Sequence, residues 1–232
     1  LTAAYHLYPD HDITLFEAGG HIGGHVHTHN VTLGEHDYLI DSGFIVFNRR
    51  TYPNFINLLS ELGVESQESH MSFSVSCSVS GLEYNGSNLN TLFAQRKNLL
   101  RPGFWRMLHD ILRFNREAPK LLLDGEDEIG LGDYLDAGGY GRLFHHYYIL
   151  PMGAAIWSTE PSRMLNFPAR FFVRFFQNHG LLSIKDRPVW RVVRGGSRSY
   201  VDRLVAPFQD RIRLRCPVER INRGDHHVTI HT

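Results

Sequence analysis

The sequence predicts an α/β fold in which one domain is split by a long inserted segment. Three observations lead to this prediction. A helical segment and then a short β-prone run open the chain, which is the order of elements in a βαβ unit. The middle of the chain has the apolar spacing of helices, with one sheet element. Strand and helix patterns alternate again near the end. An α+β insertion into the first domain explains this order most simply.

We therefore divide the chain into three segments. Residues 1–66 form the first part of the split domain, residues 67–189 the insertion, and residues 190–232 the return into the first domain. The 232 residues are enough for two domains with cores of their own. Hydrophobic residues make up 42% of the chain and charged residues 21%, which is typical of globular proteins and argues against disorder.

Charge and cysteine content exclude several classes of protein. The 24 Lys and Arg residues equal the 24 Asp and Glu residues, so the overall charge does not indicate nucleic-acid binding. No apolar run reaches the length of a membrane-spanning helix. Cys77 and Cys216 are the two cysteines, too few for a disulfide framework, and we expect a cytoplasmic location.

Both ends of the sequence lead us to expect a longer protein. Leu1 is not an initiator Met, and residues 1–7 have the pattern of a helix with no capping signal before it. Residues 228–232 alternate like a strand with no turn after it. We expect further segments on both sides, and they can contain decisive groups.

The first segment begins with a helix over residues 1–7, a turn, and a strand over residues 13–16 that ends at Glu17. Four glycines then fall within residues 19–24, where the backbone must bend or be approached closely. Residues 38–41 predict a second strand. A helix follows over residues 51–63, with a proline near its start and a glycine at its end.

The insertion and the return segment contain mostly helices. Residues 71–79 alternate between apolar residues and mainly serine, the period of a half-buried strand. The further elements predicted in the insertion are a helix after Pro102, a loop with Glu126-Asp127-Glu128, helices near Tyr134-Leu135 and from Leu143 to Tyr148, and a helix capped by Asn166 and closed at Gly180. From Lys185 the character changes to a strand. The elements that follow are a Gly195-Gly196 turn, a helix from Tyr200 to Leu204, a strand over residues 212–218 and a hairpin turn at Gly224-Asp225.

The acid at the end of the first strand is the first candidate for binding chemistry. In dinucleotide-binding βαβ units an acid lies ~20 residues beyond the first glycine of the phosphate loop. Counting back from Glu17 places that loop just before residue 1. A carboxylate at this point can accept hydrogen bonds from two ribose hydroxyls. Any α/β domain can also end a strand in Glu, so Glu17 alone does not decide the matter.

A glycine pair follows this acid at a distinctive spacing. Gly23-Gly24 stand six and seven residues after Glu17, His25 stands eight after it, and Thr28 eleven. This spacing resembles the motif of the flavoenzyme superfamily of amine oxidases, protoporphyrinogen oxidases and phytoene desaturases. In that superfamily two arginines stand where this chain has His21 and His25. The glycines let the backbone approach a pyrophosphate or ribityl chain.

The resemblance extends over nearly the entire chain. The stretch from Ile40 to Phe44 resembles the superfamily's Asp-x-Gly segment along the flavin ring, and Gly195-Gly196 resembles the return into the flavin domain. The matches to a bacterial branch described as predicted NAD/FAD-dependent amine oxidoreductases are Ser72-Phe73-Ser74-Val75, Gly81-Leu82-Glu83-Tyr84, Ala155-Ile156-Trp157-Ser158 and the stretch from Trp190 to Arg198.

The resemblance implies FAD as cofactor, bound by an incomplete FAD/NAD(P)-binding Rossmann-like domain. By this resemblance Glu17 binds the adenosine ribose, and Gly23, Gly24 and His25 lie against the phosphates and ribityl chain. The cofactor-binding residues that it implies are Glu17, Ala18, Gly23, Gly24, His25, Gly43 and Phe44 beside the flavin ring, and Val218 near the adenine. The resemblance identifies neither catalytic residues nor a metal site.

The resemblance implies an FAD-dependent oxidoreductase that moves a hydride from a C–N or C–C bond of a small-molecule substrate to flavin N5. The aromatic insertion favours an apolar substrate. Two alternatives stay open: a flavin-dependent isomerase like the sugar mutases of this fold, and a non-catalytic nucleotide-binding or membrane-associated protein. The sequence leaves the substrate, the electron acceptor and the oligomeric state undetermined.

Three other patterns have simpler readings. His25, His27 and His29 could bind a transition metal from one strand face, but the flavin motif already explains them. The aromatic stripe from Phe171 to Phe176, with its interleaved arginines, is interpreted first as part of a hydrophobic core. A substrate tunnel and a membrane contact are the second and third interpretations. The alternating arginines from Arg211 to Arg215 are expected on a solvated strand face rather than a nucleic-acid surface.

Overall fold

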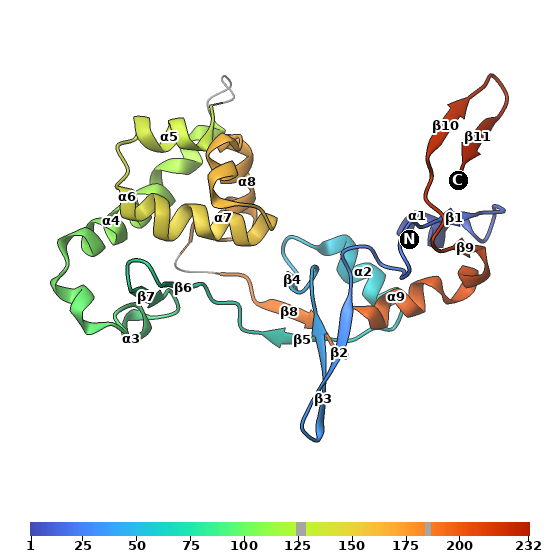
Figure 1. Ribbon diagram of the computed structural model, residues 1–232, viewed down its shortest axis with the longest axis horizontal. Coiled ribbons are helices and arrows are strands. Elements are labelled where there is room, and N and C mark those ends of the chain that lie inside the picture. Colours follow the sequence, from blue (N-terminus) through green and yellow to red (C-terminus); the bar gives the residue numbers. More distant parts are fainter. Residues whose placement is uncertain (124–128, 184–186) are drawn as a thin grey trace. The chain divides into compact units, whose positions relative to one another are not determined.

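The structure is a computed structural model that describes residues 1–123, 129–183 and 187–232. It divides into two compact units, which we treat separately (Figure 1). Unit 1 contains Leu1–His70 and Val189–Thr232, and unit 2 contains Met71–Pro188. The chain thus leaves unit 1 and returns to it. The predicted loop with Glu126-Asp127-Glu128 and the change of character at Lys185 lie outside the described residues.

Unit 1 contains the predicted first helix, first strand, hairpin strands and return helix. Its elements in chain order are α1 (Thr2–Leu7), β1 (Leu15–Phe16), β2 (Thr28–Leu33), β3 (His36–Asp41), β4 (Phe47–Asn48), α2 (Pro53–Glu61), β5 (Ser66–Ser69), β8 (Trp190–Val193), α9 (Arg198–Val205), η5 (Ala206–Arg211), β9 (Ile212–Arg213), β10 (Arg220–Arg223) and β11 (Val228–His231).

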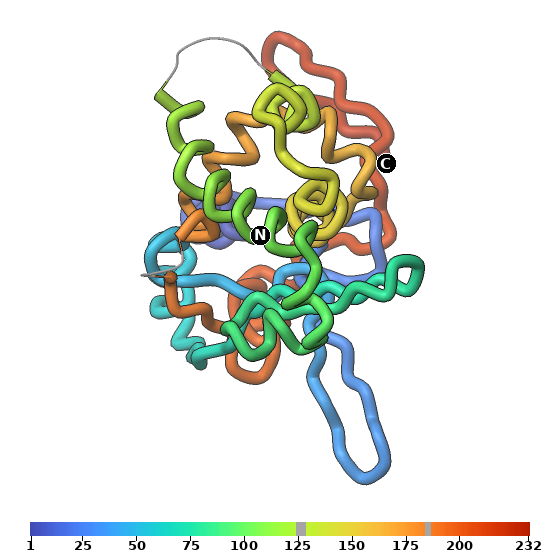
Figure 2. Tube along the Cα trace, turned by 90° about the vertical axis from the view of Figure 1, so that its left-hand side faces the viewer, coloured from blue at the N-terminus to red at the C-terminus, as the bar shows by residue number. Residues whose placement is uncertain are grey.

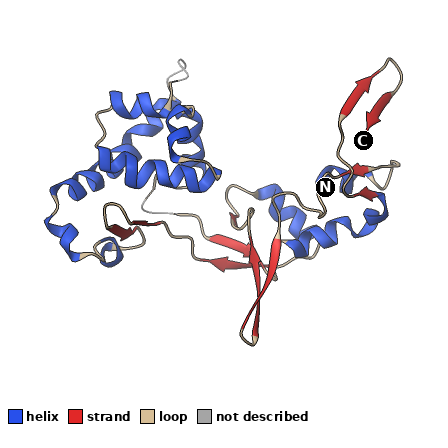
Figure 3. Ribbon diagram, viewed as in Figure 1, coloured by secondary structure: helices blue, strands red, loops and turns tan. Residues whose placement is uncertain are grey.

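The strands of unit 1 form small sheets (Figure 3). β1 pairs in parallel with β9, so the return segment lies directly beside the first strand. β8 lies between β4 and β5 and pairs antiparallel with both. β2 and β3 form a long hairpin that projects from its base, as the blue strands in Figures 1 and 2 show. β10 and β11 form a second hairpin around the predicted turn.

The core of unit 1 is divided into two small clusters. The first joins Ala4 of α1 to Val201 and Val205 of α9 and to Phe208. The second joins Phe47 of β4, Leu59 of α2 and Val193 of β8. Each strand pair beyond these clusters is largely exposed, so polar and backbone contacts hold much of unit 1 together.

Unit 2 is mostly helical and has one large core. Its elements are β6 (Ser74–Cys77), β7 (Leu82–Asn85), α3 (Leu89–Leu92), η1 (Arg96–Leu100), α4 (Pro102–Glu117), η2 (Ala118–Leu122), α5 (Leu131–Ala137), α6 (Arg142–Phe144), a π-helical turn η3 (His145–Ile149), α7 (Leu150–Trp157), η4 (Pro161–Asn166) and α8 (Ala169–Asn178). The aromatic side chains of α4, α6 and α8 meet in its centre.

The α8 stripe is divided between core and surface. Phe172 and Phe176 are fully buried, whereas Phe171 is exposed. The four phenylalanines therefore belong mainly to the core of unit 2, the first of the readings offered by the sequence. None of the helices among the described residues is long and apolar enough to cross a membrane.

Three sequence predictions are wrong in detail. Residues 212–218 do not form one strand, because β9 ends at Arg213 and Arg215 has a left-handed φ of 53°. Arg211 lies in η5, so the alternating arginines do not share a strand face. Asn166 ends η4 and does not cap α8, whose first turn has no side-chain cap.

Candidate functional site

Glu17 stands directly after β1, where both its N–H and its carbonyl bond to the return segment. Its N–H donates to the Arg213 carbonyl at 2.9 Å, and its carbonyl accepts from the Cys216 N–H at 2.9 Å. Its Oε1 accepts from the N–H of Gly19 at 2.6 Å. The carboxylate is thereby fixed over the start of the glycine loop, at the carboxyl end of a parallel strand, where α/β folds bind ligands.

The glycine loop needs its glycines for two different reasons. Gly23 has φ of 128°, and a Cβ there would lie 2.5 Å from the carbonyl oxygen of Val26. Gly24 has φ of 60°, and a Cβ there would meet nothing within 4 Å. Gly23 is therefore required by the fold, whereas the space beside the Gly24 Cα is open and the Gly24 carbonyl lies 3.3 Å from His21 Nε2.

The loop continues into a close backbone contact with the segment after β3. The Phe44 N–H donates to the His25 carbonyl at 3.3 Å. Gly43 has φ of 121°, and a Cβ there would clash with the same carbonyl. His25, Gly43 and Phe44 are thus brought together, as the resemblance implies for residues on one cofactor.

An aromatic group anchors Phe44. Its ring lies 5.2 Å from the ring of Phe55 and 6.3 Å from that of Tyr52, edge to face in both cases. Tyr200 of α9 contacts Phe55 at 5.1 Å. Burial raises the pKa of Tyr52 above its usual value. This packing fixes the backbone around Gly43 without using the backbone groups that face the loop.

Asp41 connects the hairpin to the return helix. Its Oδ1 and Oδ2 accept from the Ser197 N–H at 2.9 and 3.0 Å, and its Oδ2 also accepts from the Ser197 hydroxyl at 3.0 Å. Thr28 donates to the same carboxylate and accepts from the Arg198 N–H at 2.9 Å. Asp41 and Thr28 therefore satisfy the N-terminal amides of α9 across a long sequence separation.

The sequence analysis assigned no role to this network, although its residues stand in the segments that carry the resemblance. Ser197 is fully buried and Thr28 nearly so. A Cβ at Gly196 would lie 2.6 Å from Thr28 Cγ2, and its φ is 83°. The second glycine of the return turn is thus needed for this close approach. Ser197 directly follows this glycine. That position is the one sequence signal that could have identified the serine.

Three histidine rings lie against one another beside the loop, the first pair stacked and the second tilted. The rings of His21 and His27 lie 4.3 Å apart and those of His27 and His29 4.0 Å apart. Partial loss of hydration, together with His29, His21 and Arg198, lowers the pKa of His27. No group of three or more His, Cys, Asp or Glu residues in the described parts of the chain is arranged to hold a metal ion.

The return segment also brings a basic side chain to the glycine loop, three residues before Val218. Val218 stands two residues beyond Cys216, which bonds to the Glu17 backbone, and it is 41% exposed. The Arg215 N–H donates to the Gly19 carbonyl at 3.0 Å. Its guanidinium Nε would lie 3.5 Å from a Cβ at Gly20. The left-handed turn at Arg215 therefore brings a cation to the glycine loop. The sequence analysis had placed this arginine on a solvated strand face.

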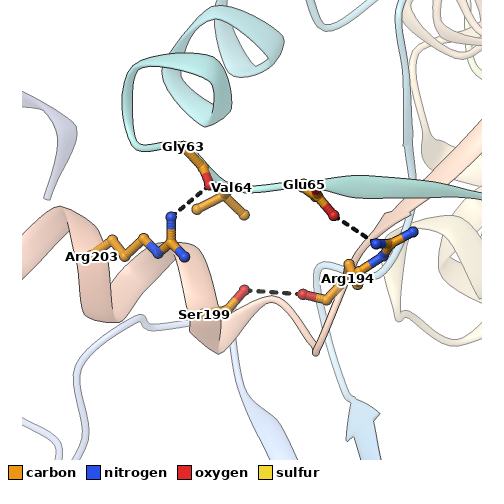
Figure 4. Close-up of a pocket in the computed structure, with 6 residues that line it drawn as sticks. All are labelled: Gly63, Val64, Glu65, Arg194, Ser199 and Arg203. Carbon is orange, nitrogen blue, oxygen red and sulfur yellow. Dashed lines mark hydrogen bonds and ion pairs between the residues drawn. The ribbon is translucent and has the colours of Figure 1, made fainter.

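A cavity of about 280 Å³ in unit 1 lies apart from these residues (Figure 4). It is lined by Gly63, Val64, Glu65, Arg194, Ser199 and Arg203. Arg194 pairs with Glu65 at 2.6 Å, and Arg203 donates to the Gly63 carbonyl at 2.6 Å. None of the predicted cofactor-binding residues lines it.

The family model for flavin-containing amine oxidoreductases matches residues 1–232. The chain belongs to this family. FAD is the cofactor that this membership assigns, and the fold is that of the FAD-dependent amine oxidases, in incomplete form. A comparison with curated proteins gave no match.

Solved structures of the family share this fold at low sequence identity. Cyclohexylamine oxidase from Brevibacterium oxydans IH-35A has a TM-score of 0.68 and 18% identity, over 99% of this chain and 51% of that chain. A triple mutant of putrescine oxidase has a TM-score of 0.65 and 18% identity, over 98% of this chain and 50% of that chain. The chain thus spans about half the length of these structures.

The residues of unit 1 fit the adenosine-diphosphate half of FAD. A carboxylate is fixed at the end of a parallel strand, and the loop after it has open space beside Gly24 and a guanidinium close to Gly20. The carboxylate can accept hydrogen bonds from the ribose hydroxyls. The amide and guanidinium donors beside it match the pyrophosphate that follows the ribose.

Proposed function

We propose that the protein is an FAD-dependent amine oxidoreductase. The observation that carries the proposal is the arrangement around Glu17: a carboxylate fixed over the glycine loop, with the return segment bonded to its N–H and its carbonyl. When bound, the flavin supplies the redox chemistry by accepting a hydride at N5 from a C–N or C–C bond.

The residues of unit 1 have binding roles in this proposal. Glu17 accepts hydrogen bonds from the ribose hydroxyls, with Ala18 beside it and Val218 against the adenine. Gly23, Gly24 and His25 approach the pyrophosphate and ribityl chain through their backbone groups. Gly43 and Phe44 border the flavin ring.

We further propose an apolar amine as the substrate. The support is the aromatic content of unit 2 and a cavity of about 370 Å³ there, lined by Ser80, Leu82, Leu100, Arg101, Pro102, Gly103, Phe104, Leu143 and Tyr147. The solved relatives are named for cyclohexylamine and for the charged diamine putrescine. Of these two amines, the apolar lining favours the cyclic one.

The visible spectrum of the full-length protein and its extracted cofactor test this function. We expect flavin absorbance, FAD in the extract, and anaerobic bleaching by cyclohexylamine at lower concentration than by putrescine. A colourless protein that takes up no added FAD would contradict flavin binding. Turnover of a substrate without bleaching would replace the oxidoreductase with an isomerase.

We also propose a cytoplasmic location. Both Cys77 and Cys216 are free in the structure. Fractionation of the source cells tests this location. Recovery of the protein outside the cytoplasmic fraction would contradict it.

A further inference from the structure

Three histidine side chains connect the glycine loop to the base of the β2–β3 hairpin. His21 belongs to the loop, His27 stands directly before β2, and His29 lies within it. The His27 ring is in the middle, with its centre 4.3 Å from that of His21 and 4.0 Å from that of His29. We call these three side chains the histidine row. Its members come from two segments, so the ring contacts hold the loop against the hairpin.

The two outer rings of the histidine row are anchored, and the central ring is not. His21 Nε2 lies 3.3 Å from the Gly24 carbonyl oxygen, within the loop. His29 Nε2 lies 2.9 Å from the hydroxyl oxygen of Ser42, in the segment after β3. Among the described residues, neither ring nitrogen of His27 has a hydrogen-bond partner. The outer contacts therefore position a central imidazole whose two nitrogens are available to a ligand.

The surroundings of the central ring favour neutral imidazole. Partial loss of hydration lowers the pKa of His27, followed in size by the effects of His29, His21 and Arg198. Each of these neighbours acts by repelling a proton on the central ring. His27 is therefore protonated less readily than an ordinary histidine.

The carboxylates near the histidine row are engaged elsewhere. Asp202 lies 3.5 Å from the Nε of Arg198. Asp41 accepts hydrogen bonds from Ser197 and Thr28. In the parts of the chain that the structure describes, no carboxylate bonds to a ring of the row. The charge that these carboxylates offer to His27 is thus offset by their own partners.

The loop side of the histidine row carries a further positive charge. The Arg215 guanidinium Nε would lie 3.5 Å from a Cβ at Gly20, the residue before His21. The nearby Glu17 carboxylate accepts from the Gly19 N–H at 2.6 Å. Surroundings with this balance of charge attract an anion. An anion beside the row would favour the protonated ring and so oppose the repulsion that keeps the ring neutral.

We propose that the histidine row binds the pyrophosphate of FAD and takes up a proton from the solvent as it does so. This inference rests on the proposed function, which supplies the diphosphate. The bound anion favours the imidazolium form of His27, in which both ring nitrogens are donors. One of them donates to a phosphate oxygen. No covalent bond of the cofactor changes, and the only transfer is that of a proton from water or buffer to the ring.

Proton uptake makes the affinity for FAD depend on pH. Binding raises the pKa of His27, so the gain in affinity is complete below the pKa of the free ring. The gain is lost as the pH rises through the pKa of the ring in the complex. The pyrophosphate itself stays ionised over this range. We expect FAD to bind about tenfold more tightly near pH 6 than near pH 8.

Calorimetry on the full-length apoprotein tests the inference. FAD affinity is measured near pH 6 and near pH 8, in two buffers of different ionisation enthalpy, so that proton uptake is measured as well. His27→Phe keeps an aromatic ring in the row that cannot be protonated, and it should lose most of the pH dependence and of the proton uptake. His36→Phe, at an exposed histidine of the same hairpin, is the matched control and should keep both.

Two calorimetric results would overturn the inference. One is an FAD affinity of the unaltered protein that is equal at both pH values or that falls toward acid. The other is a pH dependence that is unchanged in His27→Phe. In both cases FAD binds, so the proposed function stands while this inference fails.

Nuclear magnetic resonance titration of the histidine rings gives a second measure that does not need the flavin. The His27 resonance is assigned by its absence from His27→Phe, and inorganic pyrophosphate is the probe. Pyrophosphate should raise the pKa of His27 by about one unit, whereas an equal ionic strength of sodium chloride should not. A protein that responds in this way but binds no FAD would contradict the proposed function and keep the anion site. A pKa of His27 that pyrophosphate leaves unchanged would contradict the anion site.

Discussion

Unit 2 and unit 1 are stabilised in different ways. Among the described residues, unit 2 has a single cluster of 18 buried apolar side chains, whereas the two clusters of unit 1 have four and three. Unit 1 depends instead on polar contacts between distant segments, such as those of Asp41 with Ser197. The difference indicates that packing determines unit 2, while the positions of the loops in unit 1 are determined by a few specific hydrogen bonds.

The largest effect is expected from a cavity in unit 2. Phe144 is fully buried and contacts the rings of Tyr140 and Tyr148. Phe144→Ala should lower the free energy of unfolding of unit 2 by about 3–5 kcal/mol. Hydrogen exchange of the full-length protein should show lost protection in unit 2 and not in unit 1. Leu89→Ala, at an exposed leucine, is the control, and equal loss in both units would contradict separate stabilisation.

Asp41→Ala should be the corresponding change in unit 1. It removes the acceptor for the Ser197 amide and hydroxyl and for Thr28, so we expect a loss of about 3 kcal/mol confined to unit 1. Asp37 accepts from Thr32 on the same hairpin but is exposed. Asp37→Ala is therefore the matched control, expected within about 0.5 kcal/mol. Both variants are measured by urea unfolding. Equal losses of unfolding free energy in the two variants would contradict a stabilising role for the polar network.

High pH should weaken unit 2 through its buried tyrosines. Burial raises the pKa of Tyr148 to about 12 from an ordinary value of 10.0. The fold therefore favours the neutral phenol, and the stability this contributes is complete below pH 10 and is lost as pH rises through about 12. The loss amounts to about 3 kcal/mol. Tyr148→Phe should flatten the dependence measured by thermal unfolding, whereas Tyr38→Phe, at an exposed ring, should leave it unchanged. The same slope in all three proteins would contradict this.

The sequence predicted the packed elements better than the polar ones. The α4 and α2 helices have clear apolar spacing. The helix predicted over residues 51–63 is observed as Pro53–Glu61, and the helix predicted after Pro102 begins at Pro102. β5 is Ser-Gln-Glu-Ser and has no apolar pattern, so nothing in the sequence indicated a strand. Its pairing with β8 depends on a contact between distant parts of the chain, which local periodicity does not encode.

The same reason explains what was missed around the candidate site. Glu17 and the glycine loop are close in sequence, so their spacing was informative. Arg215 was assigned to a strand because residues 212–218 alternate, but the chain turns there to bond with Gly19 and Glu17. These backbone bonds override the strand pattern and bring Arg215 to the loop.

FAD affinity of a single variant tests the central claim most directly. Glu17→Gln keeps an oxygen for the Gly19 N–H and removes only the charge that should bind the ribose hydroxyls. We expect calorimetry on the full-length apoprotein to show FAD binding weakened about 10- to 100-fold, with Glu35→Gln, at an exposed glutamate of the β2–β3 turn, unchanged. Equal FAD affinity of the Glu17→Gln variant and the unaltered protein would contradict the assignment of Glu17 to the cofactor.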